Sequence, residues 1–65
     1  MEPMTERQLN FLAFHLWQNG YKGDAMSIKK LKDNVDKGTA MDVIGMFKKG
    51  QVEMGLNQLR HLNAI

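Results

Sequence analysis

The stretch TAMDVIGMFKKG, residues 39–50, decides the fold class because it has the clearest helical periodicity in the chain. Its apolar residues follow the i, i+3, i+4, i+7 spacing of one helix face, and they are Ala40, Val43, Ile44 and Phe47. Thr39 is the predicted N-cap of this helix, with Asp42 three residues on. The Lys-Lys-Gly sequence at 48–50 is typical of a helix end, since cations favour the C-terminal dipole and glycine favours the left-handed turn.

A first helix is predicted upstream, beginning at Thr5. Gln8 follows three residues later and completes the capping-box spacing. Asn19 and Gly20 end this helix, because Gly20 can take the left-handed conformation of a Schellman motif.

A second helix is predicted between these two. Asp24 or Ser27 is its N-cap, and it ends at Gly38. Its narrow apolar stripe consists of Ile28, Leu31 and Val35.

The chain after Gly50 predicts a fourth helix, over residues 51–62. The alternative is one long helix that contains Gly45, Gly50 and Gly55, and each glycine would cost about 1 kcal/mol relative to alanine. The broken version is favoured. No segment alternates with a period of two. We therefore predict an all-α protein, a small bundle of three to four short helices, forming a single domain over residues 1–65 with residues 1–4 as an N-terminal tail.

The predicted core combines the apolar stripes of all four helices. Its members are Leu9, Leu12, Leu16, Ile28, Leu31, Val35, Val43, Ile44, Phe47, Val52, Leu56 and Leu59.

Composition excludes several kinds of chemistry. The chain has 65 residues and no cysteine, so it has no disulfide, no cysteine-ligated metal and no thiol nucleophile. His15 and His61 lack a metal-ligand spacing, and Ser27, the only serine, is a candidate helix cap. We therefore predict no catalytic residues, no metal, no cofactor and no small-molecule substrate.

The location in the cell is also constrained by the sequence. The densest apolar stretch, residues 11–17, is interrupted by His15 and is far shorter than the roughly 18–20 residues of a membrane span. The N-terminus carries Glu2 and Glu6 where a secretory signal carries cations. We expect a cytoplasmic protein that does not contact a membrane.

The first helix has more apolar surface than one face can bury. Leu9, Leu12, Ala13 and Leu16 share one arc with Trp17 at its edge, whereas Phe11 and Phe14 fall outside it. Either this helix is central and buried nearly all round, or the two phenylalanines form a docking face for a partner. Four methionines, at 26, 41, 46 and 54, also flank the core arcs, and methionine suits adaptable binding surfaces.

These observations predict a non-enzymatic interaction protein, which is a small regulator, inhibitor or adaptor. Its partner is another protein or a second copy of itself. The predicted partner-binding residues are Phe11, Phe14, Gln18, Met41, Met46 and Met54.

The alternative hypothesis is a helix-turn-helix-like regulator that binds DNA through the lysine-rich region 22–49. Nine Lys and Arg against seven Asp and Glu give a net charge of +2. A basic region is expected of a protein that contacts phosphates. The candidate contacts are Lys29, Lys30, Lys32, Lys48 and Lys49. Asp33 and Asp36 follow Lys29 and Lys32 at i+4 and are expected to compensate part of that charge.

Overall fold

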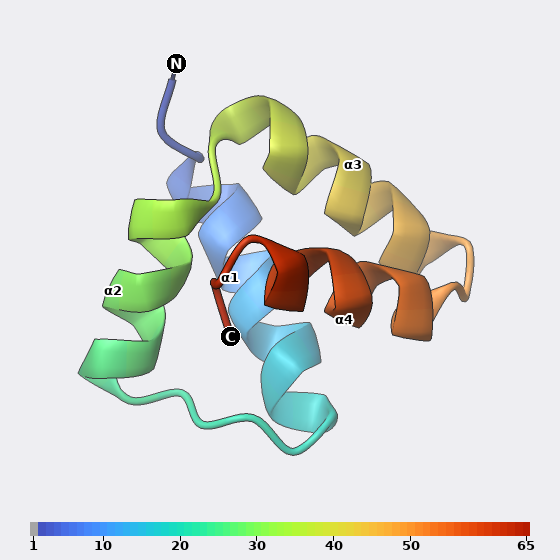
Figure 1. Ribbon diagram of the computed structural model, residues 1–65, viewed down its shortest axis with the longest axis horizontal. Helices are drawn as coiled ribbons and strands as arrows, with labels where there is room; N and C mark the ends of the chain where they lie inside the picture. The colour runs from blue at the N-terminus through green and yellow to red at the C-terminus, as the bar shows by residue number, and fades with distance from the viewer. Residues whose placement is uncertain (1) are drawn as a thin grey trace.

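The structure is a computed structural model that describes residues 2–65 as four helices joined by short turns (Figure 1). The helices are α1 (Glu6–Gln18), α2 (Ala25–Asn34), α3 (Lys37–Lys48) and α4 (Val52–His61). Apart from one isolated bridge between Pro3 and Asp36, residues 2–65 contain no β structure. The prediction of a small all-α bundle is confirmed, and the chain is broken into separate helices at Gly50.

Helix α1 begins where the capping-box spacing predicts. The backbone N–H of Gln8 donates to the Thr5 hydroxyl at 3.1 Å, and the backbone N–H of Thr5 donates to the Gln8 side-chain oxygen at 3.0 Å. These bonds satisfy two N–H groups at a helix start, where backbone donors otherwise lack intrahelical partners. The start of α1 is therefore determined by its local sequence.

Three of the helices end in the same arrangement, the Schellman motif. After α1, the N–H groups of Gly20 and Tyr21 both donate back to carbonyls of the last helical turn, and Gly20 has a φ of +91°. The same pair of bonds ends α3, where Gly50 has a φ of +79°, and α4, where Asn63 has a φ of +61°. The predicted ends at Gly20 and Gly50 are confirmed.

The predicted boundary between α2 and α3 is wrong. Gly38 does not end α2 and Thr39 does not cap α3. Val35 is extended, and Asp36 is the N-cap whose carboxylate accepts the Thr39 N–H at 2.8 Å. Asp36 and Thr39 are both residues that can cap α3, and a contact with the N-terminal segment favours Asp36. The Lys37 N–H donates to the Glu2 carbonyl at 2.9 Å, beside the bridge between Pro3 and Asp36. Gly38 therefore lies in the first turn of α3.

The helix contacts run in the order α2, α1, α3, α4, because α1 packs on α2 and α3, and α3 packs on α1 and α4. Figure 1 shows α2 on one side of α1, with α3 and α4 on the other. Each helix contributes one of the largest fully buried side chains, and these are Leu12, Leu31, Val43 and Leu59. Of the other predicted core residues, Leu9, Ile28, Ile44 and Val52 are half-buried. Three buried hydrophobic residues are not in the predicted core: Ala40 lies on the periodic face of α3, and Met4 and Ala64 lie outside the helices.

Residues near both ends of the chain, Met4 and Ala64, belong to the hydrophobic core. Residues 1–4 were expected to form a tail; residue 1 lies outside the described residues, and Met4 is part of the core.

Between α3 and α4, Gly55 lies directly against the buried ring of Phe47. A glycine at this point lets the backbone of α4 approach that ring closely.

Candidate functional site

The outward face of α1 carries two exposed aromatic side chains. The exposed fractions of Phe14 and Trp17 are 54% and 65%. Residues three apart are neighbours on a helix surface, so the two rings belong to one patch, which we call the exposed aromatic pair. Gln18, four residues after Phe14, is exposed on the same side of the helix. Two predicted partner-binding residues, Phe14 and Gln18, thus lie beside Trp17, which the helical wheel had placed at the core edge.

Phe11 has a different environment from Phe14. It is half-buried and packs against the core, with its ring centroid 4.3 Å from that of His15 and 5.6 Å from the Lys48 Nζ. The His15 ring in turn stacks on Phe47, with centroids 5.5 Å apart and planes 14° from parallel. His15 is therefore enclosed by aromatic rings on the α1 and α3 sides, and Phe11 belongs to this cluster.

The three predicted methionines come together on α3 and α4. Met41, Met46 and Met54 line one shallow hollow, with Asp42 and Lys49 among its polar residues. Met41 and Met54 are more than half exposed, and Met46 is half-buried. We call this surface the methionine hollow. It is lined by residues 41–54 only, so the residues of α1 take no part in it.

The predicted lysines divide into two groups. Lys29, Lys30 and Lys32 lie on α2, which packs on α1 alone among the helices, whereas Lys48 and Lys49 lie at the far end of α3. Figure 1 shows these two regions on opposite sides of the molecule. The link between α2 and α3 is extended, and α2 does not pack on α3 as the two helices of a helix-turn-helix do.

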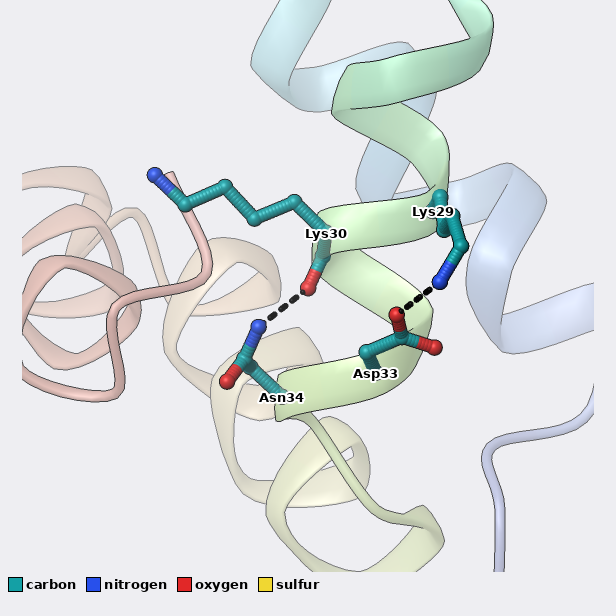
Figure 2. A network of polar contacts seen from close by, with 4 residues as sticks. All are labelled: Lys29, Lys30, Asp33 and Asn34. Carbon is teal, nitrogen blue, oxygen red and sulfur yellow. Dashed lines mark hydrogen bonds and ion pairs between the residues drawn. The ribbon is translucent and has the colours of Figure 1, made fainter.

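Part of the lysine charge is neutralised on α2 itself. The Lys29 Nζ lies 2.6 Å from the Asp33 carboxylate, one helical turn away, and this hydrogen bond raises the pKa of Lys29 (Figure 2). Asn34 donates a hydrogen bond to the Lys30 carbonyl, which leaves the ammonium group of Lys30 outside this network (Figure 2). The compensation expected between Lys29 and Asp33 is present, whereas Asp36 caps α3.

The structure does not gather ligands for a metal. Within residues 2–65 no three His, Asp or Glu side chains lie close enough together to hold an ion. The same residues form no helix with the length and apolarity needed to cross a bilayer.

Comparisons with known proteins found no match. No family model, curated protein or solved structure matches this chain.

Trp17 is the residue that sequence reasoning assigned differently. The helical wheel gives its angle relative to Leu16, but the angle alone does not say how far the neighbouring helix extends. α2 covers the side of α1 that carries Ala13 and Leu16, and Trp17 lies beyond it.

Proposed function

We propose that this chain is a non-enzymatic interaction protein, a small regulator, inhibitor or adaptor, that docks a protein partner through the outward face of α1. The observation that carries the proposal is the exposed aromatic pair, Phe14 and Trp17. Large aromatic side chains, tryptophan above all, are enriched among the residues that dominate binding energy at protein interfaces.

The size of this patch supports the proposal. From the exposed fractions of the two rings, about 250 Å² of mostly apolar surface faces water, and its burial is worth about 6 kcal/mol. Association itself costs about 4–15 kcal/mol in lost freedom, so two rings alone do not make a stable complex. Additional contacts are needed, and Arg7, Asn10 and Gln18 surround the pair on the same side of α1.

The methionine hollow is the second contact surface in this proposal. Its flexible side chains can adapt to a partner's shape, as methionine-rich binding surfaces do. Because its residues come from α3 and α4, it is an independent patch, and variants of Met41 and Met54 test it separately from α1.

The test begins with the oligomeric state. Size-exclusion chromatography with light scattering over a wide concentration range distinguishes a monomer from a self-associating chain. A tagged chain is then used to capture a partner from its native cell, and the captured protein is purified and titrated against the chain. We expect the double variant Phe14→Asp, Trp17→Asp to remain folded by circular dichroism and to lose this binding.

The matched control is Met26→Asp. Met26 is 81% exposed on α2, so the substitution places a carboxylate on an equally apolar and exposed position away from α1. Binding should persist in this variant. A folded double variant that binds its partner as tightly as the wild type would remove the basis of the proposal, as would a chain that is monomeric and captures nothing.

DNA binding through the lysines has less support, because Lys29 is paired and the other candidate lysines face two sides of the bundle. Phosphate-driven binding is strongest at low salt, so a mobility-shift assay at low ionic strength distinguishes the two hypotheses. A shift that disappears in Lys30→Gln, Lys32→Gln would favour the DNA-binding alternative.

A further inference from the structure

A small cavity lies between α1, the loop that follows it, α2 and the C-terminal segment. Its volume is about 130 Å³. The interior is mostly apolar, and the side chains that shape it include Ala13 and Leu16 of α1, Ile28 and Leu31 of α2, and Ile65. The exposed aromatic pair and the methionine hollow contribute nothing to its wall, so it is a separate feature from the proposed docking surfaces.

The volume sets the size of a group that the cavity accepts. A protein cavity of about 150 Å³ with apolar walls holds a benzene molecule. A cavity of about 130 Å³ therefore suits a single aromatic ring or an alkyl group of similar size. A long acyl chain does not fit inside it.

The polar part of the wall is cationic. Lys22 and Lys30 both line the cavity, together with Ser27 and Tyr21, and no Asp or Glu side chain lines it. The ion pairs among residues 2–65 join Lys29 to Asp33 and Lys37 to Glu2, so neither cavity lysine is engaged in one. Figure 2 shows the Lys30 side chain extended away from Lys29 and Asp33.

Two other polar groups, on Asp24 and Tyr21, lie near these lysines, and both accept hydrogen bonds from other residues. The carboxylate of Asp24 accepts the Ser27 N–H at 2.9 Å as the N-cap of α2. Hydrogen bonds from Ser27 lower the pKa of Asp24, and nearby Lys22 adds a smaller effect in the same direction. The Tyr21 hydroxyl accepts a hydrogen bond from Arg60 at 2.9 Å, which adds a third cation beside the cavity wall. Lys22, Lys30 and Arg60 therefore bring three cations to the cavity, with the Asp24 carboxylate as a nearby anion.

We propose that this cavity binds a small monocarboxylate whose apolar part is about the size of a benzene ring, with the ring inside the cavity and the carboxylate at Lys22 and Lys30. The apolar wall gives the ring an environment that it prefers to water. The two ammonium groups supply charge-assisted hydrogen bonds to the carboxylate oxygens. Binding needs no catalytic group, and it does not depend on the docking of a protein partner at α1.

The probe is phenylacetate, titrated into the isotope-labelled chain and followed by NMR. Binding is expected at millimolar concentrations, with shifts concentrated on Ala13, Ile28, Ala64 and Ile65. Phenylacetamide, which has the same shape without the charge, should bind more weakly. Raising the salt concentration should weaken phenylacetate binding, because the lysines are exposed enough for ions to screen them.

Variants separate the two parts of the site. Lys22→Gln and Lys30→Gln should each weaken phenylacetate binding about two- to fivefold, the range expected for exposed charge pairs. The matched control is Lys32→Gln, which removes an exposed lysine of α2 that does not line the cavity, and it should leave the affinity unchanged. Ala13→Leu fills part of the cavity and should abolish binding.

The outcomes are distinguishable. If phenylacetate causes no localised shifts up to tens of millimolar, the cavity is not a ligand site and the proposal fails. If phenylacetamide binds equally well, or if Lys32→Gln weakens binding as much as Lys30→Gln does, the assignment of the carboxylate to Lys22 and Lys30 is wrong. Should Ala13→Leu fail to fold, the lysine variants still decide the matter.

Discussion

Alanine substitutions at Gly55, which lies against a buried ring, and at Gly45, which has open space beside it, test the packing of α3 against α4. A Cβ atom at Gly55 would lie 2.9 Å from one ring carbon of Phe47 and 3.2 and 3.3 Å from two others. A Cβ atom at Gly45 would have no neighbour within 4 Å. Both glycines lie inside helices, so both substitutions gain about 1 kcal/mol of helix propensity. Only the packing differs between them.

The magnitude follows from that difference. Contacts below 3.0 Å force a shift, and the Phe47 ring has little room because it is 6% exposed and stacked on His15. Overpacking a core costs about 1–3 kcal/mol. At Gly55 this cost cancels the gain of about 1 kcal/mol in helix propensity or exceeds it. We therefore expect Gly45→Ala to stabilise the protein by about 1 kcal/mol. Gly55→Ala should lie about 1–3 kcal/mol below it in stability.

The assay is equilibrium unfolding in urea with thermal unfolding as a second measurement. In a domain of this size, 1 kcal/mol moves the Tm by about 4–8 °C, so the two variants should be well separated. In a Phe47→Leu background the obstructing ring is gone, and Gly55→Ala should then behave like Gly45→Ala. Equal stabilisation by both alanines in the wild-type background would refute the close approach of α4 to Phe47.

Three further predictions concern a turn, the core and a helix cap. Gly50→Ala should destabilise the protein by about 1–2 kcal/mol in urea unfolding, because alanine is strained at a φ of +79°; an unchanged midpoint would contradict the left-handed end of α3. Leu12→Ala should cost about 2–5 kcal/mol, since Leu12 is fully buried, and a loss below 1 kcal/mol would contradict its central position. Hydrogen bonds from Thr39, first from its backbone N–H, lower the pKa of Asp36, so Asp36 stabilises the fold above its ordinary pKa of 3.8 and loses this effect as the pH falls through its lower folded value. Asp36→Asn keeps a cap without the titration, and its unfolding midpoint should fall less between pH 5 and 2 than that of the wild type.

The helix ends were predictable because each is determined within a few residues. The pairing of Thr5 with Gln8 and the glycines at 20 and 50 act through local backbone bonds. The boundary at Asp36 was not predictable in this way. Thr39 offered an equally local cap signal, and the contact of Lys37 with Glu2, more than thirty residues earlier, favours the other solution.

The candidate surfaces were predictable only in part for a related reason. Helical periodicity gives the direction of each side chain, and it correctly put Phe14 and Met54 outside the core arcs. Helical periodicity does not say how much of a helix its neighbours cover. That coverage determines that Trp17 is exposed and that Phe11 is half-buried. The cavity at Lys22 and Lys30 combines residues 13–31 with the distant residues Ala64 and Ile65, so no periodicity could indicate it.

The position of α2 at the edge of the bundle has a dynamic consequence. It packs on α1 alone and less closely than α3 packs on its neighbours, so its detachment breaks the smallest helix interface in the fold. Amide hydrogens of α2 should therefore exchange with solvent through a partial opening of lower free energy than global unfolding. A ligand in the cavity would contact α2 at Ile28 and Leu31, so it should slow amide exchange in α2 more than in any other helix.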